Sequence, residues 1–213
     1  MSVWSNYDHT RLFPDEDCLR FLSSLQDEYH DSQIQVCDFG VGNGRSGQGI
    51  KHFFPNSRLM AIDKFLDGFK NSSFQSFYDE VREDLHGLKV DVVLDVMTSQ
   101  HFPWSEHDEY FQLVADALNP GGWFFLKHLN YDCSDAKLIE PIDDARMTFK
   151  NIPNLPAACF PDNGITAMPF HRVLLTALQE NGLPPFRAYR VIREEDEKVF
   201  AHSVFFCQKE RTL

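Results

Sequence analysis

The sequence has no run of about 18 apolar residues, so it offers no candidate for a transmembrane helix. Its N-terminal residues lack a basic stretch followed by an apolar one, so no secretory signal is expected. Basic residues are few, since 20 Lys and Arg stand against 32 Asp and Glu, for a formal net charge of −12. No Lys/Arg-rich run provides the basic face of a nucleic-acid binder. We therefore expect a cytoplasmic protein that binds neither membrane nor nucleic acid.

Cysteine is scarce and scattered along the chain. The five cysteines are odd in number, and no two form a C-x-x-C pair. Disulfide frameworks and zinc sites both need patterned cysteines, so the sequence predicts reduced, buried thiols and no structural zinc. The five are Cys18, Cys37, Cys133, Cys159 and Cys207.

Glycine, by contrast, is concentrated directly after a short apolar run. Three glycines stand at alternate positions there, and a helical pattern begins after them. A glycine turn between a strand and a helix lets a ligand approach bare backbone and directs the helix's free N–H groups at that ligand. The three are Gly40, Gly42 and Gly44.

A second apolar run completes the pattern. The first run ends in Asp38, and the second, about 58–63, ends in Asp63, 25 residues further on. This succession of strand, glycine turn, helix, strand and acid predicts a nucleoside-binding half of an α/β domain.

The glycine turn fits two kinds of nucleoside site. Residues 42–47 formally match the G-x-G-x-x-G pattern of dinucleotide sites. The frame Asp38-x-Gly40-x-Gly42-x-Gly44 fits better, because it includes the acid that directly follows the strand. This frame resembles the first motif of the class I S-adenosylmethionine-dependent methyltransferases, whose glycine loop lies under the amino-acid and ribose parts of the cofactor. The resemblance implies that these four residues bind the cofactor.

The resemblance continues downstream and spans about residues 33–130. In that family an acid at the end of the second strand binds the ribose hydroxyls, and here the position is Asp63. A third-strand motif, in which an Asp and the following backbone N–H contact adenine, is matched by Asp84 and Leu85. Residues 119–122, Asn-Pro-Gly-Gly, resemble the turn before the fifth strand.

Apolar periodicity and the resemblance together imply an α/β fold. We expect a three-layer α-β-α sandwich with a seven-stranded, mostly parallel sheet and a C-terminal antiparallel strand pair, the Rossmann-like methyltransferase fold. We expect a single domain over 1–213, with an N-terminal helical cap at 1–32 and an insertion at 130–168 that covers the acceptor site. Helices are expected at 15–29, 45–54, 106–118 and 169–181, with a helix or loop at 65–78. Strands are expected at 34–38, 58–63, 80–84, 90–97, 122–129, 186–193 and 199–208.

Methyl transfer demands little chemistry of the protein, because the sulfonium is already a strong electrophile. The enzyme aligns acceptor, methyl and sulfur and excludes water, and an amine or hydroxyl acceptor must also lose a proton. His101, four residues past the fourth expected strand, is our candidate for a catalytic base, with His128 second. Arg11 or Arg45 could pair with the carboxylate of the cofactor.

A metal-assisted reaction would need carboxylates and an amide at the ends of the fourth and fifth strands. Asp95, Asn130 and Asp132 lie near those ends, but Asp95 falls inside its strand. We therefore expect no metal.

These features predict a methyltransferase that moves a methyl group from S-adenosylmethionine to an oxygen or nitrogen of a small-molecule acceptor by in-line displacement and releases S-adenosylhomocysteine. Three alternatives stay open: a protein side-chain methyltransferase, a catalytically silent nucleoside-binding partner subunit, and a nicotinamide oxidoreductase. The sequence identifies neither the acceptor nor the oligomeric state.

Overall fold

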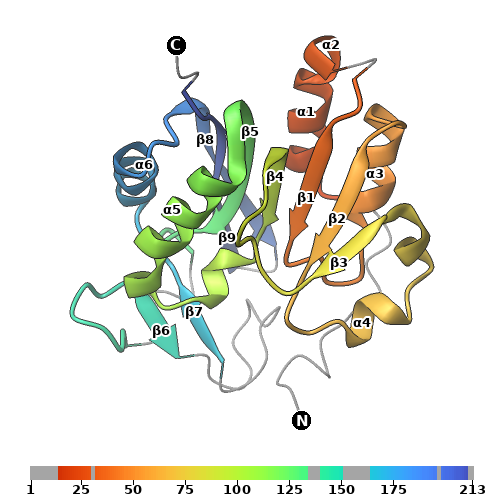
Figure 1. Ribbon diagram of the computed structural model, residues 1–213. Coiled ribbons are helices and arrows are strands. Elements are labelled where there is room, and N and C mark those ends of the chain that lie inside the picture. The colour runs from red at the N-terminus through yellow and green to blue at the C-terminus, as the bar shows by residue number, and fades with distance from the viewer. Residues whose placement is uncertain (1–13, 30–31, 134–139, 151–163, 196–197, 211–213) are drawn as a thin grey trace.

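The computed structural model describes residues 14–29, 32–133, 140–150, 164–195 and 198–210 (Figure 1). Its centre is a seven-stranded sheet in the order β3-β2-β1-β4-β5-β9-β8. The first five strands run parallel, β9 is antiparallel to β5, and β8 is antiparallel to β9. This confirms the expected Rossmann-like sheet. The strands are β1 (Gln35–Phe39), β2 (Arg58–Ile62), β3 (Glu80–Arg82), β4 (Val90–Val96), β5 (Leu118–Leu129), β8 (Pro185–Glu195) and β9 (Lys198–Gln208).

Helices cover both faces of the sheet (Figure 1). The helices α1 (Glu16–Ser24) and α3 (Ser46–Phe53) lie on one face, and α5 (His107–Ala117) and α6 (His171–Glu180) lie on the other. Successive side chains of a strand point to opposite faces, so β5 serves both cores. Its Phe125 packs in the core under α1 and α3, and its Phe124 packs in the core under α5 and α6.

The N-terminal helical region departs from the expected single helix at 15–29. The helix α1 ends at Ser24, and a separate short helix, α2, spans Gln26–Tyr29. The Ser24 hydroxyl donates to the Phe21 carbonyl oxygen at 2.7 Å, and the Leu25 N–H donates to the Leu22 carbonyl oxygen at 3.2 Å. These two bonds tighten the last turn of α1. Apolar spacing continues across this break, which is why periodicity alone missed it.

The start of β5 also differs from the prediction. The expected turn at 119–122 lies inside the strand, which begins at Leu118. The register with β4 jumps there from Val90–Leu118 to Val92–Trp123, so the Asn-Pro-Gly-Gly segment forms a bulge.

The remaining elements gather near the carboxyl ends of the parallel strands. Between β2 and β3 lie α4 (Asp67–Lys70) and the 3₁₀ helix η2 (Ser73–Phe77), and after β4 follow η3 (Ser99–His101) and η4 (Trp104–Glu106). Between β5 and α6, β6 (Thr148–Lys150) pairs antiparallel with β7 (Ile165–Ala167). The N–H of Trp104 donates to Thr148 Oγ1 at 2.8 Å, so this small sheet is tied to the segment that follows β4.

A buried ion-pair network fastens the start of α1 to the sheet. Lys127 on β5 is 4% exposed, and its Nζ lies 2.7 Å from Asp15 Oδ2 and 2.8 Å from Asp17 Oδ2. Tyr189 on β8 donates to the other oxygen of Asp17 at 3.0 Å. The positive charge of Lys127 therefore offsets the negative charges of Asp15 and Asp17 at the start of α1, where this helix packs on the sheet.

Two further observations concern the sequence expectations. No helix in the described part of the chain is long and apolar enough to cross a membrane. The described cysteines, Cys18, Cys37, Cys133 and Cys207, are buried and carry free thiols, and Cys159 lies outside the described residues.

Replacing Lys127 by Met should lower the free energy of unfolding by about 3–5 kcal/mol, because the buried carboxylate of Asp17 and the partly buried carboxylate of Asp15 lose their cation. Glu16→Gln on the same helix is the control, since its ion pair with Arg20 is exposed and should contribute about 1 kcal/mol or less. Urea unfolding measures both variants. A loss in Lys127→Met no larger than that of the control would contradict the role of the network.

Candidate functional site

The strand order places the candidate site between β1 and β4. The strand β1 pairs with β2 on one side and with β4 on the other, so the loops leaving β1 and β4 diverge at their carboxyl ends. Ligands of open α/β sheets bind in the crevice at such a reversal of strand order. In Figure 1 the arrowheads of β1 and β2 point to the lower side of the picture, where β6 and β7 also lie.

The three alternating glycines form the loop after β1, and all have left-handed backbones. Their φ angles are +72° at Gly40, +57° at Gly42 and +85° at Gly44, a region that L side chains rarely adopt. Their surroundings differ, however. A Cβ on Gly40 would lie 2.0 Å from Thr98 Oγ1, whereas one on Gly42 would meet no atom closer than 3.9 Å. Gly42 is therefore the part of the loop that a ligand can approach.

Asp63 lies beside this open glycine. Its Oδ2 accepts from the Gly42 N–H at 3.2 Å, and its Oδ1 accepts from the Phe65 N–H at 2.8 Å. The structure thus brings together the glycine loop and the acid that ends β2, although 21 residues separate them. Two backbone donors fix the direction of the carboxylate.

Asp38 lies underneath the loop and is buried. Tyr78 donates to its Oδ2 at 2.5 Å, and the same hydroxyl lies 3.1 Å from the Gly44 carbonyl oxygen. Burial raises the pKa of Asp38 to about 7, while the Tyr78 hydrogen bond and the charge of Arg45 act in the opposite direction. Asp38 thus supports the loop from below, beside a tyrosine that the sequence analysis did not identify.

Asp95 fixes the segment that follows β4. Its carboxylate accepts from the N–H groups of Thr98 and Ser99 at 2.8 and 3.3 Å and from the Tyr110 hydroxyl at 2.9 Å. Burial raises its pKa to about 6. Met97, which lies between β4 and Thr98, has a left-handed backbone with φ of +66° although it is not a glycine.

The three residues considered for a metal have separate partners. Asn130 donates to Ser203 at 3.3 Å, and Asp132 pairs with Arg190 at 2.7 Å, so neither joins Asp95. Within the described ranges, no group of three His, Cys, Asp or Glu side chains is arranged to hold a metal ion.

The adenine candidates lie at the end of β3. Asp84 is exposed, and its Oδ1 accepts from the His86 N–H at 3.0 Å. The side chain of Leu85 is buried in the core together with Leu88.

The histidines occupy different environments. His101 in η3 is hydrogen-bonded to the backbone of Ile165 in β7, and burial of its imidazole lowers its pKa to about 3. His128 is fully buried, with its Nε2 3.0 Å from Nε2 of His107, so it faces α5. Burial lowers the pKa of both members of this pair.

Two arginines were expected as possible partners of the cofactor carboxylate. Arg11 lies outside the described residues, and Arg45 directly precedes α3.

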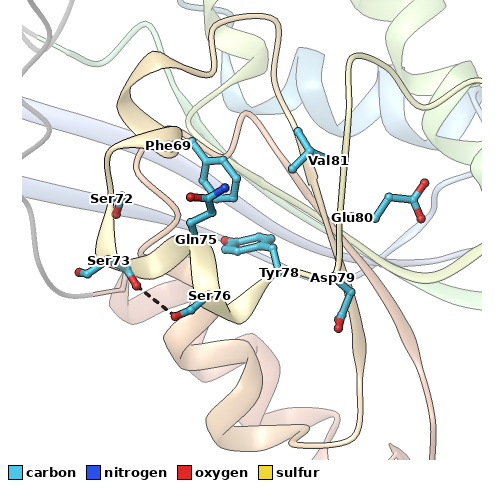
Figure 2. Close-up of a pocket in the computed structure, with 9 residues that line it drawn as sticks. All are labelled: Phe69, Ser72, Ser73, Gln75, Ser76, Tyr78, Asp79, Glu80 and Val81. Atoms are coloured by element: carbon cyan, nitrogen blue, oxygen red, sulfur yellow. Dashed lines mark hydrogen bonds between the residues drawn. The ribbon is translucent and has the colours of Figure 1, made fainter.

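A cavity of about 550 Å³ adjoins the site on the side of η2 and β3. Figure 2 shows the side chains that line it, with the rings of Phe69 and Tyr78 packed edge to face. Tyr78 therefore lies between this cavity and the glycine loop. The lining residues are Phe69, Ser72, Ser73, Gln75, Ser76, Tyr78, Asp79, Glu80 and Val81.

Three residues of the site were not identified from the sequence. Thr98 and Tyr78 follow no motif, and only their contacts with the glycine loop reveal them. Phe65 is 48% exposed beside Asp63. Its position two residues after the acid that ends β2 is the sequence signal that could have identified it as part of the site.

Comparisons with known proteins agree with this architecture. Residues 7–183 match the family described as "Methyltransferase domain". Among curated proteins, no sequence matches the chain.

Solved structures share the fold at low identity. An S-adenosylmethionine-dependent methyltransferase from Methanosarcina mazei has a TM-score of 0.68 at 13% identity, covering 87% of this chain and 97% of that one. One from Clostridium acetobutylicum has a TM-score of 0.64 at 13% identity, covering 92% of each chain. The 1,6-didemethyltoxoflavin-N1-methyltransferase of Burkholderia thailandensis, solved with 1,6-didemethyltoxoflavin and S-adenosylhomocysteine, has a TM-score of 0.61 at 16% identity, covering 92% of this chain and 80% of that one.

Alanine at Gly40 should destabilise the protein more than alanine at Gly42. Both changes force a side chain into a left-handed backbone, at about 1–2 kcal/mol each. Only the Gly40 variant also drives a Cβ into Thr98, which should add about 1–3 kcal/mol. Urea unfolding of the two variants measures the difference. Equal losses would contradict the contact between the loops that leave β1 and β4.

Proposed function

The chain belongs to the methyltransferase-domain family, and from that membership we propose that it transfers a methyl group from S-adenosylmethionine to an oxygen or nitrogen of a small-molecule acceptor. The observation that carries this proposal is the open backbone at Gly42, with the Asp63 carboxylate hydrogen-bonded to its N–H at 3.2 Å. A nucleoside needs close backbone contact and an acid for its sugar, and both are present at the reversal of strand order.

The residues at this reversal of strand order suit an S-adenosyl cofactor. Asp63 would accept from the two ribose hydroxyls, because a carboxylate can accept from adjacent donors at once. The glycine loop would support the amino-acid part, and the exposed ring of Phe65 offers an apolar face for adenine, which Asp84 would also bind. The sulfonium, when bound, supplies the electrophilic methyl group, so the hard chemistry belongs to the cofactor.

The protein would contribute alignment, exclusion of water and removal of a proton. The acceptor would lie over the segment after β4, where Asp95 holds the N–H groups of Thr98 and Ser99. His101 follows in the same segment. Burial lowers its pKa to about 3, so its imidazole is uncharged at neutral pH but weakly basic, and contact with a bound acceptor would have to raise this pKa for His101 to take the proton.

Two observations favour a small acceptor. The formal net charge of −12, without a basic run, disfavours nucleic acid. The structurally related Burkholderia enzyme was solved with 1,6-didemethyltoxoflavin together with S-adenosylhomocysteine. Methylation of a protein side chain and a silent partner subunit are the alternatives. A transfer screen over amines, phenols, carboxylic acids and peptides separates them, since a silent subunit would bind the cofactor and methylate none of these.

S-adenosylhomocysteine should bind in calorimetric titration, and Asp63→Ala should weaken it about 10- to 100-fold, because a charged hydrogen-bond acceptor for the sugar is lost. Asp116→Ala is the control, as it removes the same charge from an exposed position near the end of α5. Unchanged affinity in Asp63→Ala would refute its assignment to the ribose, and absence of binding to the wild type would refute the proposed function.

If His101 takes the acceptor proton, His101→Ala should lower kcat about 10²-fold and leave the affinity for S-adenosylhomocysteine unchanged. Exposed His52 on α3 provides the control variant, His52→Ala, which should retain full activity. A steady-state assay with the acceptor found in the screen gives kcat. Full activity of His101→Ala would exclude His101 as the base.

A further inference from the structure

Tyr78 contacts the glycine loop at several points, although no sequence motif includes it. Its hydroxyl donates to Asp38 Oδ2 at 2.5 Å and lies 3.1 Å from the Gly44 carbonyl oxygen. Its ring lies against Gly47, where an added Cβ would be 2.6 Å from Tyr78 Cε2. Gly47 does not have a left-handed backbone, so the space needed by the ring explains why glycine is found there.

The position of Tyr78 is fixed independently of the loop. The next residue, Asp79, accepts from the Leu59 N–H at 2.8 Å and from Lys51 Nζ at 3.4 Å, which ties the chain to β2 and α3. Phe69 packs edge-on against the ring, with centroids 5.1 Å apart at 89°. Figure 2 shows these two rings as one wall of the cavity. Tyr78 is thus held from behind while its hydroxyl reaches beneath the loop.

The charge of Asp38 depends on this hydroxyl. Burial disfavours the ionised carboxylate, and the nearby acids Asp63 and Asp95 add to that effect. Tyr78 provides the largest opposing contribution, and Arg45 at the start of α3 provides the next. Two buried thiols, Cys18 of α1 and Cys37 of β1, also lie within the field of Asp38, and their raised pKa values keep them uncharged.

We propose that Tyr78 is a positioning residue of the cofactor site. Its hydroxyl holds Asp38 and Gly44 at the underside of the glycine loop and supports a negative charge on Asp38 for the cationic amino-acid part of the cofactor. The inference rests on the proposed function. The ligand class is an amino-acid nucleoside with a free ammonium group. Because a bound cation favours the ionised carboxylate, binding below about pH 7 releases a proton from Asp38.

The first experiment needs no ligand. Carbon-13 NMR of aspartate-labelled protein follows the titration of Asp38, whose signal is identified by its loss in Asp38→Asn. Tyr78→Phe keeps the ring and removes the donor, so the midpoint should move upward by about one pH unit or more. Tyr189→Phe is the matched control, because it removes a hydroxyl from Asp17 on α1 and should leave the Asp38 midpoint unchanged. An unchanged midpoint in Tyr78→Phe overturns the proposal.

The second experiment measures affinity for S-adenosylhomocysteine by calorimetry from about pH 5.5 to 8.5. Wild-type affinity should rise with pH through about 7 and level off above it, because the carboxylate must be ionised. In Tyr78→Phe the rise should shift upward, which weakens binding about tenfold at pH 7 and little at the highest pH. A loss that is equal at every pH indicates packing alone and overturns the proposal. Absence of binding to the wild type at any pH overturns the proposed function, and the NMR titration still tests the link between Tyr78 and Asp38.

Gly47→Ala provides an independent route to the same result. A Cβ there displaces the ring of Tyr78 and with it the hydroxyl, so the Asp38 midpoint should move in the same direction as in Tyr78→Phe. In a Tyr78→Phe background the added methyl group should change the midpoint little, because the donor is already absent. Additive midpoint shifts would mean that Gly47 and Tyr78 act separately, against the proposal.

Discussion

The contact between Gly40 and Thr98 is the constraint on which the site depends. Without a side chain at Gly40, the loop that leaves β1 lies directly against the segment that leaves β4. Asp95 holds that segment through the N–H groups of Thr98 and Ser99, so both sides of the contact are fixed where the strand order reverses. Asp63 and the buried Asp38 take their places relative to this contact, Asp63 beside the glycine loop and Asp38 beneath it.

Most of the fold could be predicted because its elements have simple apolar patterns. The strand β4 is buried on both faces and appears in the sequence as an apolar run, and α5 repeats apolar residues on one side. The errors arose where local hydrogen bonds or register decide the structure. The break at Leu25 follows from a bond between Ser24 and Phe21, and the early start of β5 depends on a bulge against β4. Neither the break nor the bulge can be recognised from the spacing of apolar residues in the sequence.

The site was predictable only where its residues directly follow the first two strands. The three glycines and Asp63 lie together as the sequence suggests, because strand ends in a parallel sheet meet at one edge. Tyr78 reaches Asp38 across 40 residues, and no local pattern signals that contact. His128 was misjudged as a second candidate base, because strand residues alternate between faces and its side chain turns into the core beside His107. The cofactor roles assigned to Asp38, the three glycines, Asp63, Asp84 and Leu85, and the catalytic role assigned to His101, remain predictions.

The pairing of β6 with β7 has a consequence for where insertions and deletions can occur in this chain during evolution. Lys150 and Ile165 are partners in that small sheet, so the two points at which the intervening segment begins and ends are held next to each other. The entropy of closing such a loop grows slowly, by about 0.6 kcal/mol for each doubling of its length. Insertions and deletions between these two partners are therefore thermodynamically inexpensive. Changes in length between Lys150 and Ile165 can therefore accumulate without remodelling of the central sheet.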